Sequence, residues 1–262
     1  MSSFSDIYGY ETIKEHMQSA IRLGKVSHAY IINGGLGAGK KMLAGIFAKT
    51  LQCENMEESV NPCNKCHSCI QSDTGNQPDI IWVKHEKPAS IGVDDVREQI
   101  IADMQIKPYS SRYKIYIIDE AEKLTVAAQN ALLKTIEEPP VYAIIILLTE
   151  NCDSLLPTII LTTNADIFLQ TILSRCVMLD LKPIKNSIVE EYIRNNYDVS
   201  DYECRFAANF AQGRIGRAKT IVESTEFAHL KQDVMHVIKN AKDMTSGEIM
   251  AVVKDINNYK LT

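Results

Sequence analysis

The amino-acid sequence predicts an α/β fold: a parallel sheet with helices on both faces, followed by segments that are helical only. Short apolar runs suited to buried strands alternate with stretches whose apolar residues recur at helical spacing. A glycine-rich octet joins the first of these runs to a helical stretch, and after about Lys182 the strand-like runs stop. The predicted strands are Ala29–Asn33, Ile80–Val83, Lys114–Ile118 and Ala143–Leu148.

The composition is that of a globular protein with a large core and two or more domains. Of the 262 residues, 45% are hydrophobic and 23% are charged. The net charge of −5 gives no overall basic field that would attract nucleic acid. No apolar run approaches the ~20 residues that cross a bilayer, and the first residues lack the pattern of a signal peptide. We therefore expect no membrane contact and a cytoplasmic location.

The glycine-rich octet, residues 34–41, follows the first predicted strand. It reads Gly-Gly-Leu-Gly-Ala-Gly-Lys-Lys and fits the phosphate-loop template at every position but the last. Gly34, Gly37 and Gly39 allow consecutive backbone N–H groups to surround phosphate oxygens, and Lys40 would contact the terminal phosphates. The octet therefore predicts a nucleotide site. The alternative is a glycine-rich turn without a ligand.

The last position of the octet departs from the template. A serine or threonine hydroxyl there would bind Mg²⁺, but the residue is Lys41. Because one cation does not ligate another, the loop is suited to hold a nucleotide and poorly suited to hydrolyse it. Whether ATP, ADP or Mg²⁺ binds stays open at this point.

Four cysteines gather just after the helix that follows the octet. They are Cys53, Cys63, Cys66 and Cys69, and the last three form two overlapping C-x-x-C steps. Four thiolates close a tetrahedral site with no free position, which predicts structural zinc. His67 could replace one thiolate. An iron–sulfur cluster and a redox dithiol are the alternatives.

The third predicted strand ends in acidic residues. Asp119 directly follows the apolar run, and Glu120 is next. In phosphate-loop proteins a carboxylate at this point holds Mg²⁺, and a second one can polarise the attacking water. The alternative is an acidic start of a helix, which the helix dipole favours in any case.

Two further segments resemble the clamp-loader branch of the AAA+ ATPases. Residues 130–140 read Asn-Ala-Leu-Leu-Lys-Thr-Ile-Glu-Glu-Pro-Pro, and Ser174-Arg175-Cys176 follows later. The cysteine cluster is also typical of bacterial members, and the resemblance covers about residues 5–225. It implies a AAA+ P-loop core over 1–182 with a zinc knuckle at 53–69, a helical lid over 183–227, and the start of a truncated helical collar domain over 228–262.

Within that branch the chain is most similar to the delta-prime type of subunit. Its loop ends Gly-Lys-Lys where the gamma/tau type has Gly-Lys-Thr, and its acidic box reads Asp-Glu-Ala-Glu where gamma/tau has Asp-Glu-Val-His. The resemblance implies a stator in a hetero-pentamer with gamma/tau and delta subunits that loads a sliding clamp on primer-template DNA. The alternatives are an active gamma/tau-type ATPase and a AAA+ repair protein outside replication.

The resemblance also implies roles for two arginines. Arg175 corresponds to an arginine finger that reaches the ATP of a neighbouring subunit, where such fingers raise the rate by about 10³–10⁵-fold. Arg217 stands in the second sensor region of the lid, where an arginine can contact phosphates. Without the resemblance, Arg175 would be read as a surface salt bridge and Arg217 as a solvated basic helix start.

An internal repeat interrupts the resemblance. Residues 146–159 and 159–172 match at an offset of 13 residues, whereas family members have one copy of this strand and loop. The first copy keeps the usual spacing to the upstream Pro-Pro, and the second keeps the usual spacing to Arg175. The sensor residue at the strand end is therefore Thr149 or Thr162, and a tandem duplication explains the repeat.

Overall fold

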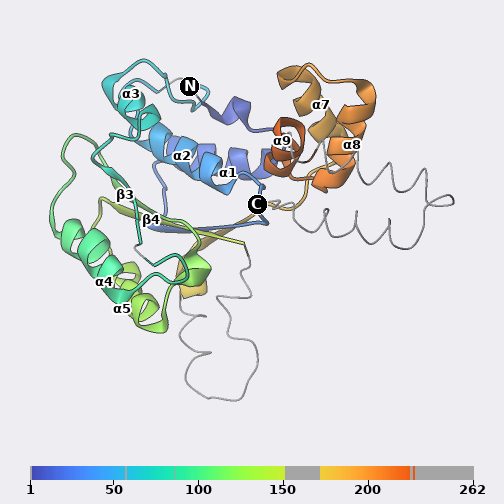
Figure 1. The fold of residues 1–262 in the computed structure, drawn as a ribbon. Helices are drawn as coiled ribbons and strands as arrows, with labels where there is room; N and C mark the ends of the chain where they lie inside the picture. The colour runs from blue at the N-terminus through green and yellow to red at the C-terminus, as the bar shows by residue number, and fades with distance from the viewer. Residues whose placement is uncertain (1, 57, 86, 151–171, 225–226, 228–262) are drawn as a thin grey trace, which may run out of the picture. The chain divides into compact units, whose positions relative to one another are not determined.

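A computed structural model describes residues 2–56, 58–85, 87–150, 172–224 and 227 of the chain. The chain divides into two compact units, residues 1–184 and 185–262. The first unit contains the sheet, and the described part of the second unit is helical (Figure 1).

The first unit is built on five parallel strands in the order β2-β3-β4-β1-β5. The α/β class and the four predicted strands are confirmed. The sequence did not predict β5, since its exposed residues alternate with half-buried and buried ones and no apolar run forms. The strands are β1 (Ala29–Asn33), β2 (Ile80–Trp82), β3 (Lys114–Ile118), β4 (Ala143–Thr149) and β5 (Val177–Asp180).

Helices cover both faces of this sheet, as predicted (Figure 1). Successive strand residues point to opposite faces, so Tyr30 and Ile32 of β1 enter one core and Ile31 enters the other. The first core is closed by α1 (Glu11–Arg22) and α2 (Lys40–Leu51), and the second by α4 (Val93–Val96) and α5 (Val126–Glu137). The remaining short elements of this unit are η1 (Phe4–Asp6), α3 (His67–Asp73), η2 (Arg97–Ala102, with π-helical geometry), η3 (Asp103–Gln105) and η4 (Ala121–Lys123).

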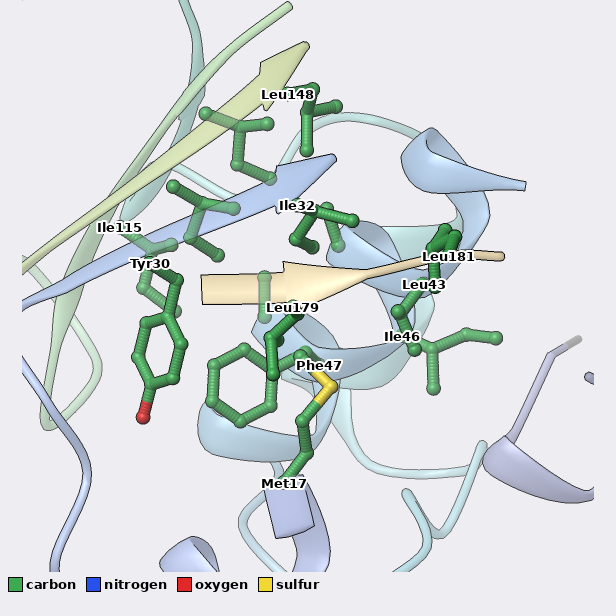
Figure 2. Packing of buried hydrophobic residues seen from close by; sticks show 14 of the residues in the cluster. Met17, Tyr30, Ile32, Leu43, Ile46, Phe47, Ile115, Leu148, Leu179 and Leu181 are labelled. Carbon is green, nitrogen blue, oxygen red and sulfur yellow. The ribbon is translucent and has the colours of Figure 1, made fainter. Parts of the chain in front are cut away.

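Phe47 anchors α2 to the sheet from the middle of the first core. Its side chain is fully buried, and its ring meets Tyr30 edge-on with 5.1 Å between ring centroids. Figure 2 shows Phe47 and Met17 from the helices together with Tyr30 and Ile32 from β1. This packing fixes α2, and therefore the turn that precedes α2, against the end of β1.

The Phe47→Ala substitution is expected to lower the free energy of unfolding by about 3–5 kcal/mol, because it leaves a cavity in a close-packed core. Urea unfolding followed by circular dichroism measures the loss. Tyr109→Ala is the matched control, since that side chain is 88% exposed and its removal should change stability by about 0.5 kcal/mol or less. Equal losses in the two variants would contradict the central position of Phe47.

The described part of the second unit consists of three helices. They are α7 (Asn186–Asn196), α8 (Asp201–Ala211) and α9 (Ile215–Glu223). Ser200 starts α8 with a capping box, in which Ser200 and Glu203 each accept a backbone N–H of the other. The predicted collar region, 228–262, lies outside the described residues. Among the described helices, none combines the length and apolar character that crossing a bilayer requires.

Candidate functional site

The octet forms a loop at the edge of the sheet where the parallel strands end. β1 ends at Asn33, and the next residue, Gly34, donates its N–H to the carbonyl oxygen of Thr149 at the end of β4, at 3.1 Å. Asn33 in turn donates from its side chain to Asp180 at the end of β5, at 2.9 Å. Ligands of open α/β sheets bind at this edge, and the loop is therefore placed for a ligand.

Two glycines of the loop are required by its shape. A Cβ atom on Gly34 would lie 2.9 Å from Cβ of Leu181 and 3.3 Å from Cβ of Ala38, which is too close. Gly39 has a φ of 93°, in the left-handed region that glycine adopts without strain, and it caps the start of α2. The first turn of α2 therefore presents its free N–H groups at this loop.

Lys40, the first residue of α2, folds back over the loop. Its Nζ donates to the carbonyl oxygen of Gly34 at 2.5 Å and lies 3.7 Å from Oε1 of Glu150. Only 10% of the Lys40 side chain is exposed. An incoming phosphate could replace these contacts, since the ammonium group has three N–H donors.

Lys41 and Asp119 form an ion pair across the site. Nζ of Lys41 lies 2.7 Å from Oδ2 of Asp119, which directly follows β3. The sequence predicted that Asp119 would approach the loop, and the structure brings the two together. The carboxylate that the sequence assigned to Mg²⁺ is thus bound by the cation that replaced the usual hydroxyl.

The second acid of the pair also has a lysine partner. Glu120, with a φ of 51°, accepts from Nζ of Lys123 at 2.7 Å. His85 Nε2 lies 3.9 Å from the same carboxylate, while His85 Nδ1 donates to the carbonyl oxygen of Lys87 at 2.7 Å. The hydrogen bond from Lys123 lowers the pKa of Glu120, and the charges of Lys123, His85 and Lys41 act in the same direction.

Sequence reasoning missed Lys123 and His85 as members of this site. Lys123 stands three residues after Glu120, and the spacing of a lysine three residues from an acid was a usable signal for this pair. His85 follows β2, and nothing in its sequence neighbourhood indicates that this strand end approaches Glu120.

The residues at this edge do not fit Mg²⁺. In phosphate-loop proteins the ion takes one ligand from the loop hydroxyl and one from the strand-end aspartate. Here Lys41 supplies no oxygen, and both Asp119 and Glu120 are already neutralised by lysine at 2.7 Å. A divalent ion would have to displace an ammonium group from each carboxylate that it approached.

The four cysteines lie together, as the sequence predicted. Their Sγ atoms are all within 4.8 Å of one another. A tetrahedral zinc ion with Zn–S bonds of ~2.3 Å requires sulfur atoms roughly 3.8 Å apart, so the cluster needs only slight contraction. None of the four forms a disulfide. The members are Cys53, two residues after α2, Cys63, Cys66 at the start of α3, and Cys69 within α3.

Backbone N–H groups point at these sulfur atoms. Cys63 N–H donates to Sγ of Cys53, and Cys66 N–H donates to Sγ of Cys63, each at 3.3 Å. Hydrogen bonds led by the Lys65 N–H lower the pKa of Cys63 to about 6, whereas burial raises the pKa of Cys69 and of Cys53. Such N–H donors stabilise thiolate ligands, and this donor set fits a structural zinc ion.

Arg175 lies at the end of the sheet where the strands begin, opposite the end that carries the loop. It ends a helical stretch, residues 172–175, and β5 begins at Val177. Because Val177 pairs with Tyr30 and Arg175 precedes Val177, Arg175 lies on the side where β1 begins, whereas Gly34 follows the end of β1. The four residues from Tyr30 to Gly34 alone span roughly 13 Å at ~3.3 Å per strand residue. Arg175 therefore does not reach the loop of its own chain.

The described contacts of Arg175 are at the surface. Its Nη2 lies 3.4 Å from Oε1 of Glu137, the last residue of α5, and both side chains are 43% exposed. Arg217 is exposed on α9 of the second unit, and its predicted contact with phosphate stays a prediction. Thr149 is buried at the end of β4, next to the loop, whereas Thr162 lies outside the described residues.

Comparison with known proteins finds relatives among the subunits of DNA polymerase III. A family model described as "DNA polymerase III, delta subunit" matches residues 9–160. The DNA polymerase III subunit tau of Bacillus subtilis (strain 168) is 37% identical over 186 residues, which are 71% of this chain and 30% of that protein. The DNA polymerase III subunit gamma of Buchnera aphidicola subsp. Baizongia pistaciae is 32% identical over 226 residues, which are 86% of this chain and 56% of that protein. The chain thus spans less than two thirds of the length of these relatives.

Solved structures share the fold at low sequence identity. The Thermotoga maritima RuvB Holliday junction branch migration motor is 17% identical, with a TM-score of 0.51 over 98% of this chain and 72% of that chain. A point mutant of RuvB from the same organism is 16% identical, with a TM-score of 0.52 over 90% of this chain and 67% of that chain. These matches confirm the predicted fold, a parallel sheet with helices on both faces.

Proposed function

The chain belongs to the family described as DNA polymerase III, delta subunit, and on that premise we propose that it is a clamp-loader subunit that does not hydrolyse ATP itself. In this proposal it is a scaffold of the delta-prime type in a hetero-pentamer with gamma/tau and delta subunits. Through that complex it supports the loading of a sliding clamp on primer-template DNA in the cytoplasm. A zinc ion on the four cysteines stabilises its core.

One observation carries the proposal: the ion pair between Lys41 and Asp119 at 2.7 Å. Hydrolysis in phosphate-loop ATPases depends on a metal ion that neutralises charge on the transferred phosphoryl group and on a base or water-positioning group. Here the metal-binding carboxylate is bound to lysine, and Glu120, the group that would polarise water, is bound to Lys123. Both chemical requirements are therefore unmet within the described part of this chain.

The position of Arg175 supports the same proposal. Since this arginine lies at the opposite end of the sheet from its own loop, a role in phosphate chemistry requires the site of a neighbouring subunit. A guanidinium group there stabilises the charge of the transition state. The chain would then contribute to ATP turnover by a neighbouring subunit although its own site does not hydrolyse ATP.

An active ATPase of the gamma/tau type is the second candidate, and it is favoured by the relatives. The Bacillus subtilis and Buchnera proteins that match the chain are named tau and gamma subunits. In such an enzyme a water molecule or another residue would take the place of the missing hydroxyl. A AAA+ repair protein outside replication is a third class, and it predicts turnover that DNA stimulates without partner subunits.

ATP turnover by the purified chain tests these proposals. With Mg²⁺ present, we expect phosphate release no faster than that of the Lys40→Ala variant, with or without DNA, because the metal site is neutralised. Steady turnover that Lys40→Ala abolishes would contradict the scaffold proposal and favour the gamma/tau type. Turnover that appears only with DNA would favour the repair class. Lys107→Ala, an exposed lysine before β3, is the control for loss of a surface charge.

A further inference from the structure

Lys41 stands at the position where a phosphate loop normally holds Mg²⁺. A metal ion in a phosphate loop bridges a protein carboxylate and the phosphate oxygens of the nucleotide. In this chain the ammonium group of Lys41 stands against the same carboxylate, 2.7 Å from Oδ2 of Asp119. The ammonium group of Lys41 thus occupies the place beside the Asp119 carboxylate that a metal ion would take.

The ammonium group of Lys41 remains open to a ligand. Its side chain is 68% exposed, whereas that of Asp119 is 24% exposed. Lysine has three N–H donors and no acceptor, so the pair with Asp119 leaves donors for phosphate oxygens. Because Lys41 is in the first turn of α2, these donors lie beside the free N–H groups that begin the helix.

The charges nearby favour a highly anionic ligand. Lys40 and Lys41 are adjacent at the start of α2, and Lys40 is nearly buried against the loop. Asp119 and Glu120 each have a lysine partner at 2.7 Å, and the Glu150 carboxylate lies 3.7 Å from Nζ of Lys40, so each of these three carboxylates faces a lysine. A nucleoside polyphosphate without its metal carries more negative charge than the metal complex, and it suits this arrangement better.

We infer that Lys41 acts as a built-in counter-cation, and that this loop binds a nucleoside di- or triphosphate without a divalent metal ion. The inference rests on the nucleotide-holding role in the proposed function and names the form of the ligand. Added Mg²⁺ gives no gain in affinity, because it competes with Lys41 for the same phosphate oxygens. The pair with Asp119 is kept when the ligand binds.

The test is a calorimetric titration of the purified chain with ATP, once in EDTA and once in excess Mg²⁺. We expect the parent chain to bind ATP in EDTA with a Kd no more than ~3-fold weaker than in Mg²⁺. Lys41→Thr restores the hydroxyl of the template and frees Asp119, so its Kd in EDTA should be at least ~10-fold weaker than in Mg²⁺. Lys107→Thr, an exposed lysine before β3, should behave like the parent chain.

A second readout reports the metal directly. Mn²⁺ replaces Mg²⁺, and electron paramagnetic resonance measures how much Mn²⁺ the protein retains when ATP is bound. Lys41→Thr should retain Mn²⁺ with its ATP, and the parent chain should not. This measurement stays informative if the variant binds ATP weakly, since the comparison is made at saturating nucleotide.

The outcomes separate the inference from the proposed function. Metal-dependent binding by the parent chain, or no ATP binding in either condition, would overturn the inference while leaving a non-hydrolysing scaffold intact. Catalytic turnover in Mg²⁺ would instead overturn the proposed function. Equal metal dependence of the parent chain and Lys41→Thr would show that Lys41 is not the counter-cation.

Discussion

Replacing Arg175 by alanine is expected to lower ATP turnover of a reconstituted clamp loader by about 10³–10⁵-fold at the site that this residue serves. In the proposed role, the guanidinium group stabilises charge that develops on the transferred phosphoryl group, and a methyl group cannot replace it. Nucleotide binding by the chain itself should be unchanged, because Arg175 lies on the side where β1 begins and far from the loop. Turnover with clamp and primed DNA measures the effect.

Two variants distinguish a finger from a surface salt bridge. Arg175→Lys keeps the charge but loses the planar fork, so it should recover little of the lost rate. Glu137→Ala removes the partner that lies 3.4 Å from Arg175. An exposed pair of this kind is worth about 0–1 kcal/mol, and this variant should therefore leave turnover nearly intact. If Glu137→Ala and Arg175→Ala have the same small effect on turnover, Arg175 forms a surface ion pair and has no role in hydrolysis.

A control arginine on the same unit completes the design. Arg97 is exposed and forms a surface pair with Asp94 at 3.7 Å, so Arg97→Ala removes the same charge without touching the assigned finger. Its turnover should match that of the parent chain. A loss comparable to that of Arg175→Ala would mean that overall charge, and not the position of Arg175, controls assembly or turnover.

The sheet could be predicted from the sequence because the central strands have apolar side chains on both faces. β1, β3 and β4 are buried throughout apart from Asn33, and such strands are continuous apolar runs in sequence. β5 is a short edge strand with only one buried residue, Leu179. Its position beside β1 depends on tertiary pairing that no local pattern encodes.

Part of the candidate site could also be predicted from local sequence patterns. The loop and Lys41 follow a local template, and Asp119 was found because it ends an apolar strand. The neutralisation of Glu120 by Lys123 and the approach of His85 arise from the turn after β3 and from the end of β2. The Lys123 pair has a spacing of three residues that the sequence does signal, whereas the approach of His85 depends on how two separate strand ends meet, which spacing along the chain does not specify.

The cysteine cluster should control the stability of the segment behind the phosphate loop. Cys53 comes just after α2, and α3 carries Cys69. A nearly buried ion pair, Lys49 with Asp73 at 2.6 Å, joins the same two helices. Because α2 begins at the loop, disorder at its far end would loosen the element that positions Lys40 and Lys41. A metal ion on the four thiolates would therefore couple its binding to folding of this part of the unit.

Purified protein is expected to contain about one equivalent of zinc, and Cys69→Ser to contain less than about half an equivalent, because a four-ligand structural site tolerates no vacancy. The variant should lose at least ~3 kcal/mol of stability, or roughly 6–12 °C in Tm for a domain of this size. Cys204→Ser is the matched control, since Cys204 is an equally buried thiol in α8 of the second unit. It should retain the zinc of the parent chain.

The same measurements separate the three readings of the cluster. An iron–sulfur cluster would give visible absorbance and iron in place of zinc, and a redox dithiol would give a metal-free protein that forms a disulfide on mild oxidation. Removal of the metal by a chelator should lower Tm as Cys69→Ser does, with little further effect on that variant. A metal-free protein with the Tm of the parent chain would contradict the structural role, because the four thiols would then be holding α2 and α3 together by packing alone.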